Sequence, residues 1–155
     1  MIQRDNIIGH RITAVLGDSS LSDKSINFCD FLYRTDNGQC FRMPGDDNSG
    51  ELLASVEVTN SYERLNWPRE SEAHYKRNLW NAAIVDILVP ADPEKRYPDS
   101  GLIALSSGWY IMQYSCAPIG VLPFVSITQQ SERGQPMTSV WDLNDISSPG
   151  RGRDS

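Results

Sequence analysis

Cysteine and histidine have the widest chemical repertoire of the side chains in this chain, and they are few. The 155 residues include three cysteines and two histidines, His10 and His74. Cys116 ends a β-type run, where a nucleophile could sit, and its base would have to be one of these histidines. Cys29 and Cys40 fall within predicted strands. The pattern favours a buried, inert thiol at all three cysteine positions over catalysis.

Carboxylates gather most densely in one turn-rich loop that contains Asp46, Asp47 and Glu51. The loop has part of a calcium-binding pattern, but the further spaced ligands of that pattern are missing. A solvated acidic loop is therefore favoured over a metal site. Asp86 is the one carboxylate inside an apolar run. Its favoured interpretation is a hydrogen-bonded structural side chain rather than a catalytic acid.

Motifs that are diagnostic of an enzyme class are missing from the sequence. No glycine-rich phosphate loop occurs, and the Gly-x-Ser-x-Gly elbow of serine hydrolases does not occur either. The histidines and cysteines do not have the spacing of a zinc site. The sequence therefore predicts no catalytic constellation, no metal and no cofactor.

Large aromatic side chains flank a turn at Ser107-Gly108. If the following residues form a strand, Trp109 lies on one face, and Tyr110 and Tyr114 lie on the other. One face should pack in the core while the other displays amphipathic rings. Tyrosine and tryptophan are enriched at the centres of protein interfaces. These three residues are therefore the predicted anchors of a protein interface.

Two segments of the chain share one order of predicted elements: strand, polar loop, strand, glycine turn, strand. The first runs through 11–16, 30–35, Asn37-Gly38 and 39–43, and the second through 83–88, 102–106, Ser107-Gly108 and 109–112. Asn-Gly between β-type runs predicts a type I′ hairpin turn, in which both central residues have positive φ. The similarity indicates either an internal repeat or an ordinary β-meander, and the sequence leaves both interpretations open.

Local patterns predict the remaining elements. Residues 26–35 and 52–59 should form strands, the latter with Ala54, Val56 and Val58 on its buried face. Ile12, Ala14 and Leu16 should likewise share one face of a strand. A helix is predicted over 69–81, a central strand over 84–89, and a bent or edge strand over 121–127 because of Pro123. The result is a β-rich α+β fold of antiparallel sheets, built from two strand-loop-hairpin units plus one helix.

Residues 1–147 are expected to form a single globular domain, followed by a polar tail over 148–155. The sequence lacks a signal peptide and any apolar run long enough to cross a membrane. An odd number of cysteines without a CxxC pair is typical of a reduced compartment. We therefore expect a cytoplasmic protein with free thiols.

The formal net charge is −6 and the isoelectric point is about 4.8. Such an acidic chain is a poor ligand for nucleic acid or for an anionic membrane, since both attract clustered lysine and arginine. The first 66 residues carry ten carboxylates against six basic side chains. The charge suits either simple solubility or a basic protein partner.

These observations favour a non-enzymatic protein-binding module. Its most specific form is a cytoplasmic inhibitor of a basic toxin or enzyme, the role that immunity proteins have. Asp46, Asp47 and Glu51 would form a charged rim that speeds association, around the aromatic anchors. Two alternatives stay open: a small enzyme without a recognisable motif, and a structural or assembly subunit.

Overall fold

Antiparallel β-sheets and one helix make up the structure of this chain. The computed structural model describes residues 1–22, 24–44, 52–97, 99–131 and 134–143. Within these residues the strands pair antiparallel, and a single helical segment of 12 residues spans 69–80. This confirms the predicted β-rich α+β fold class.

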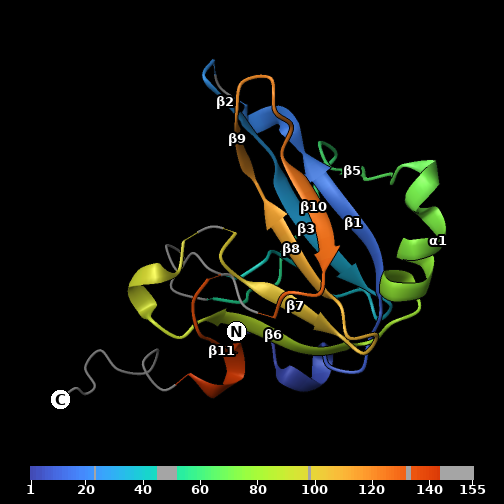
Figure 1. Ribbon diagram of the computed structural model, residues 1–155, viewed down its shortest axis with the longest axis vertical. Coiled ribbons are helices and arrows are strands. Elements are labelled where there is room, and N and C mark those ends of the chain that lie inside the picture. The colour runs from blue at the N-terminus through green and yellow to red at the C-terminus, as the bar shows by residue number, and fades with distance from the viewer. Residues whose placement is uncertain (23, 45–51, 98, 132–133, 144–155) are drawn as a thin grey trace.

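Three sheets contain the strands (Figure 1). The first has the order β4 (Cys40–Phe41), β3 (Asp30–Thr35), β1 (Ile12–Asp18) and β5 (Glu63–Arg64). The second has the order β10 (Phe124–Thr128), β8 (Tyr110–Tyr114), β7 (Leu102–Leu105), β6 (Ile84–Pro90) and β11 (Met137–Ser139). The third pairs β2 (Ile26–Phe28) with β9 (Cys116–Pro118).

Helical segments are short except for one. That segment comprises η3 (Arg69–Ser71), α1 (Glu72–Tyr75) and η4 (Lys76–Trp80), and η4 has π-helical hydrogen bonding. The single turns are η1 (Arg4–Asn6), η2 (Ser19–Leu21), η5 (Pro93–Lys95) and η6 (Val140–Asp142). The long segment lies beside β1, where Leu79 enters the core and the ring of Tyr75 stacks on Trp67 at 4.4 Å.

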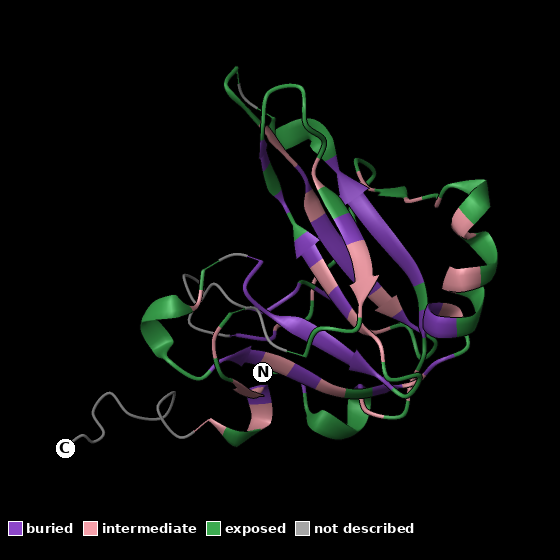
Figure 2. Ribbon diagram, in the orientation of Figure 1, coloured by how far each residue is buried: buried purple, intermediate pink, exposed green. Residues whose placement is uncertain are grey.

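One main core joins the two large sheets. It contains apolar side chains from β1, β3, β6, β7, β8 and β10, among them Val15, Tyr33, Ile87, Ile103 and Ile111. Figure 2 shows the buried residues concentrated in β1, β6 and β7, whereas the end of the molecule formed by β2 and β9 is largely exposed.

The two predicted strand-loop-hairpin units have the same backbone pairing. We call β1, β3, β4 and β5 the N-terminal unit, and β6, β7, β8 and β11 the C-terminal unit. Ile12 pairs with Thr35 in the first, and Ile84 pairs with Leu105 in the second; each pair is followed by a register shift. The two units therefore share strand order, register and a bulge at the same place, as a repeat requires.

The join between the units agrees with this relationship. Arg11 and Ala83 precede the equivalent residues Ile12 and Ile84, and they form an antiparallel bridge with each other. Equivalent residues pair antiparallel when a local twofold axis passes between them. The amide of Ile84 also donates to the carbonyl of His10 at 2.8 Å. The first strands of the two units thus meet about an approximate local twofold at this bridge.

The hairpin at Asn37-Gly38 is present, but its turn type differs from the prediction. Gly38 has φ +85°, and Asn37 does not have positive φ. The amide of Gly38 donates to Thr35, and the amide of Thr35 donates to Gln39. A two-residue type I′ turn is therefore replaced by a three-residue loop whose last residue is left-handed. Gly108, with φ +87°, closes the second hairpin in the same way.

The bulge in β1 overturns a predicted face. Ile12, Ala14 and Leu16 would share one side of a regular strand, but the register shifts between Ile12 and Ala14. Ile12 and Val15 consequently enter the main core, while Ala14 and Leu16 pack in a separate cluster on the other side. An extra residue in a strand inverts the side-chain alternation beyond it.

Other strand predictions need correction. Residues 26–35 form two strands, because the chain leaves the partner β9 at Cys29 and joins β1 from Asp30 onward. Residues 52–59 make only one bridge, from Ser55 to Phe41, and Val58 is exposed. The predicted strand over 121–127 begins at Phe124, after Pro123, and lies at a sheet edge as expected. The acidic loop and the tail over 148–155 lie outside the described residues.

Candidate functional site

Aromatic and small polar side chains cover the outer face of β8 and β10. Phe124 pairs across the strands with Tyr114, and Thr128 pairs with Tyr110. The rings of Tyr114 and Phe124 lie 4.9 Å apart, and each residue is more than two-fifths exposed. The opposite face of β8 is buried through Ile111 and Gln113. This alternation gives the sheet one core face and one aromatic face, as the sequence predicts.

Exposed aliphatic residues continue this face onto the end of the molecule. Leu122 is 79% exposed, Ile119 is 59% exposed and Val121 is 54% exposed. Leu21 of η2 and Ile26 of β2 lie at the same end and are also exposed. Together with Phe124, these six residues are called the apolar tip. In Figure 1 the tip is the uppermost part of the molecule, around β2 and β9.

The turn that carries the tip is held in one conformation. The amide of Val121 donates to the carbonyl of Pro118 at 3.0 Å, and Gly120 has φ +90°. Positive φ at the third position is the requirement of a type II turn. Asn27 of β2 donates from its amide nitrogen to Pro118 and Val121, at 3.2 and 3.0 Å. The tip therefore presents its side chains from a preorganised backbone.

A buried polar network fixes the root of the tip. The Asp99 carboxylate accepts hydrogen bonds from the Ser115 amide at 3.0 Å, the Ser115 hydroxyl and the Gln113 side chain at 3.3 Å. Gln113 in turn accepts from the hydroxyl of Tyr33 at 2.5 Å. Asp99 has φ +78°, a conformation that is costly for a non-glycine residue. The network links the loop before β7, the end of β8 and the first sheet.

The segment that carries four of the six tip residues is uncharged, whereas the exposed Lys24 lies between the other two, Leu21 and Ile26. From Ser100 to Ser131 the sequence contains no aspartate, glutamate, lysine, arginine or histidine. The six tip residues and Tyr114 expose on the order of 700 Å², close to one side of a standard protein interface. Exposed apolar patches of this size usually mark a binding site.

The predicted interface residues do not gather in one place. Tyr110 and Tyr114 lie on the same outer face of β8. Trp109 is half-buried at the start of that strand, where its ring meets the edge of His74 at 4.7 Å. It packs against the helix and not beside Tyr114. Asp46, Asp47 and Glu51 lie outside the described residues.

The sequence patterns did not predict that most of the tip residues would be exposed. Residues 121–127 look like one continuous strand, so Val121 and Leu122 are expected in a sheet. Pro118 and Pro123 enclose this apolar run and should have indicated a turn, because proline interrupts strand pairing. The length of the uncharged stretch is a second signal that was available in the sequence.

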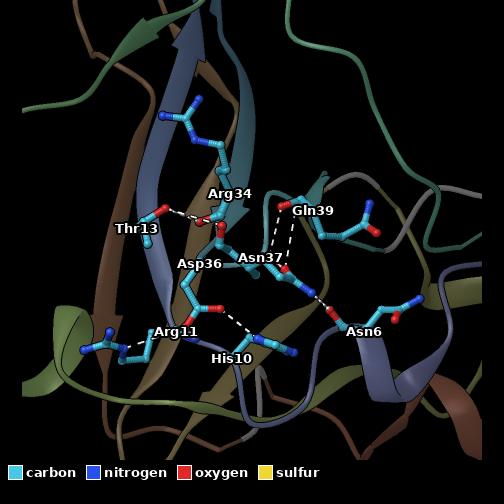
Figure 3. Close-up of polar contacts among 9 residues, drawn as sticks. Asn6, His10, Arg11, Thr13, Arg34, Asp36, Asn37 and Gln39 are labelled. Carbon is cyan, nitrogen blue, oxygen red and sulfur yellow. Dashed lines mark hydrogen bonds and ion pairs between the residues drawn. The ribbon is translucent and has the colours of Figure 1, made fainter.

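A second polar cluster lies at the opposite end of β1 (Figure 3). Nδ1 of His10 lies 2.7 Å from the Asp36 carboxylate, and the amide of Arg11 donates to the same carboxylate at 3.3 Å. The hydrogen bond to His10 holds the pKa of Asp36 below its usual value. Among the described residues, no serine, threonine or cysteine side chain is hydrogen-bonded to His10. The pair thus holds the hairpin turn of the N-terminal unit against the start of β1.

Neither histidine lies near the candidate nucleophile Cys116. Cys116 pairs with Phe28, at the end of the molecule where β1 finishes with Asp18. His10 lies before the start of β1, whose seven residues span roughly 20 Å. His74 contacts Trp109, at the other end of β8 from Cys116. The geometry therefore gives this thiol no histidine base.

The remaining chemical candidates have structural partners. Asp86 accepts hydrogen bonds from the Ser139 hydroxyl and the Ile87 amide, both at 2.8 Å, and so joins β6 to β11. Burial raises the pKa of the Cys29 thiol to about 11 and also raises that of Cys40. All three cysteines are free, but Cys116 is exposed, so the prediction of a buried thiol is correct for Cys29 and Cys40 and wrong for Cys116. A hollow of about 320 Å³ beside Asn6 is lined without any carboxylate, histidine or thiol.

The described residues form neither a metal site nor a membrane-spanning helix. No three histidine, cysteine or carboxylate side chains lie close enough to hold a metal ion in that part of the chain. The described helix is too short and too polar to cross a bilayer. No protein-family model, curated protein or solved structure matches this chain.

Proposed function

We propose that this chain is a non-enzymatic protein-binding module that docks through its apolar tip. The observation that carries the proposal is the exposure of Ile119, Val121 and Leu122 on a turn fixed by Asn27. Such side chains lose little conformational entropy on binding, since their backbone is already ordered. The Tyr114–Phe124 pair adds aromatic area beside them.

The convex shape of the tip indicates the form of its partner. A projecting turn with aliphatic side chains fits an apolar cleft better than a flat charged surface. An inhibitor that enters the cleft of a basic enzyme or toxin has these properties. The net charge of −6 would steer such a partner toward this chain, while the uncharged tip makes the contact.

The test compares a tip variant with a matched surface variant. Leu122→Ser removes the most exposed apolar side chain of the tip, and Val85→Ser removes an exposed valine from β6. A partner captured from cells that make this protein would be purified and titrated against both variants. We expect Leu122→Ser to raise the dissociation constant roughly 30-fold, the effect of losing about 2 kcal/mol of binding free energy at an interface centre. Val85→Ser should bind like the parent.

Kinetics distinguish the role of charge from that of the tip. Raising the salt concentration should slow association with a basic partner and leave the loss caused by Leu122→Ser unchanged. A partner that binds the parent and Leu122→Ser equally would show that the tip is not the docking surface. Turnover of a substrate by the purified chain would contradict the non-enzymatic proposal.

A further inference from the structure

Four strands form the outer edges of the two large sheets, and three of these edges are protected against another chain. The edge of β4 is covered where Ser55 bridges Phe41 and the amide of Val56 donates to Cys40 at 2.9 Å. The edge strand β5 consists of two charged residues, and β11 is three residues long and follows a proline. Short length, charge, proline and a covering segment are the usual protections of a sheet edge.

Along its own length the fourth edge strand, β10, has none of these protections, although Pro123 precedes it as Pro136 precedes β11. Its five residues, Phe124–Thr128, include no charge, proline or glycine. On one side it pairs with β8 over its whole length, and no described strand pairs with its other side. A bare edge of this length is a template for pairing with a further strand.

We propose that β10 pairs antiparallel with β10 of a second copy of this chain, about a twofold axis at Ser126. This pairing places Ser126 opposite itself, Phe124 opposite the partner's Thr128, and Val125 opposite the partner's Ile127. Alternate residues of an edge strand direct their backbone groups outward. With the twofold axis at Ser126, the residues whose N–H and C=O groups point outward in one copy lie opposite the corresponding residues of the other copy. The outward backbone groups of the two edges can therefore form hydrogen bonds in this register.

The side chains suit this register. Each large residue meets a smaller or β-branched one, and such cross-strand pairs stabilise sheets. On the outer face Phe124 of one copy would adjoin the partner's Thr128, so the aromatic faces of β8 and β10 become continuous across the axis. Val125 and Ile127 already pack toward the core of their own copy, which fixes the direction in which the strand faces.

Charge indicates why contact with a second copy occurs at this edge. Two chains of net charge −6 repel each other at most orientations. The stretch from Ser100 to Ser131 contains no charge, and it includes both β8 and β10. Approach along β10 therefore brings together the least repulsive parts of two identical surfaces. Ile119, Val121 and Leu122 of each tip then lie at opposite ends of the dimer, free for the docking proposed above, while Phe124 belongs to both surfaces.

Sedimentation velocity over a range of protein concentrations tests the proposal. The parent mass should rise toward that of two chains as the concentration increases. Ser126→Lys places two like charges opposite each other at the axis and should leave a monomer. Val85→Lys adds the same charge to an exposed position of β6, a strand with partners on both sides, and should dimerise like the parent. Circular dichroism would verify that both variants are folded.

A crosslink gives a second, independent readout. In a Cys116→Ser background, Ser126→Cys should form a disulfide between two chains on mild oxidation, because opposed residues of antiparallel strands lie close together. Val85→Cys in the same background should remain uncrosslinked.

Three results would overturn self-pairing through β10. The first is a parent that stays monomeric at every concentration, and the second is a dimer that persists in Ser126→Lys. The third is a monomer whose capture of another protein is abolished by Ser126→Lys, since the edge would then accept a foreign strand. Loss of partner binding in Leu122→Ser, with the dimer intact, separates the tip from the edge.

Discussion

The two units of this protein share a backbone and differ in what covers their outer faces. In the N-terminal unit, Cys40 is buried in a small cluster that Val56 and Tyr62 cover. The equivalent residue of the C-terminal unit is Tyr110, which is half-exposed. The chain after β4 folds back over its own sheet, whereas the chain after β8 adds β9, the tip and β10.

This difference separates stability from binding within one repeated architecture. The outer face of the N-terminal unit is occupied by internal packing and by the ion pair of Arg42 with Asp30 at 2.8 Å. In the C-terminal unit, Leu102 and Ala104 of β7 are buried on the outer face, whereas the same face of β8 and of its neighbour β10 is uncharged and partly exposed. The N-terminal unit therefore covers its outer face by internal packing, whereas the outer face of β8 and β10 stays partly exposed and available for binding.

The largest expected effect comes from removing a buried carboxylate. Asp99 lies in the loop before β7 of the C-terminal unit, and Asp30, with which it is compared, lies in β3 of the N-terminal unit. Asp99→Ala leaves the amide and hydroxyl of Ser115 and the amide of Gln113 without their acceptor in a buried site. We expect the free energy of unfolding to fall by about 3 kcal/mol. Asp30→Ala should lose less, about 1–2 kcal/mol, because its partner Arg42 is more than half exposed, although the hydroxyl of Tyr62 also loses its acceptor. Urea denaturation would measure both, and equal losses would contradict the distinction between the units.

A pair of glycine substitutions compares the two hairpin turns directly. Gly38→Val and Gly108→Val each force a β-branched residue to positive φ, and no atom lies within 4 Å of the added Cβ at either position. Each should lower the free energy of unfolding by about 1–2 kcal/mol through backbone strain alone. Thermal denaturation should give losses that agree within about 0.5 kcal/mol if the turns are equivalent. Asparagine at the same positions, which tolerates positive φ, is the matched control.

The smallest expected effect concerns the residue that closes each hairpin onto the first strand of its unit. Asp36 accepts from the amide of Arg11, and Ser106 accepts from the amide of Ala83 at 2.9 Å. Asp36→Ser makes the first site like the second and removes the interaction with His10. At neutral pH the free energy of unfolding should fall by less than about 1 kcal/mol, since the side chains of His10 and Asp36 are both about one-third exposed.

The pH dependence identifies the origin of that loss. The pKa of Asp36 is lower in the folded protein, so its stabilisation is present above the unfolded pKa of about 3.9 and disappears as the pH falls through the folded value. The parent and Asp36→Ser should therefore differ in stability near neutral pH and converge in acid. A difference that stays constant from neutral to acidic pH would mean that packing, not ionisation, is responsible.

The sequence by itself determined the elements whose signals are local. The glycine turns, the helix over 69–80, the apolar run that becomes β6 and the order of the two units all follow from short-range patterns of turn residues and hydrophobicity. The alternation along β8 also placed Tyr110 and Tyr114 on one face correctly. These features depend on residues that are neighbours in the chain, so composition and spacing suffice to find them.

Only the tertiary structure decided which surfaces are covered. The bulge in β1 redirects Ala14 and Leu16, the two-residue strand β5 exists only because β1 lies beside it, and Trp109 is withdrawn from the surface by His74. The conformation of the tip is fixed by Asn27, which lies far away in sequence and donates to the carbonyls of Pro118 and Val121. The exposure of a segment depends on all of its tertiary contacts. These contacts join residues that are far apart in the chain, so they leave no repeating pattern in the sequence.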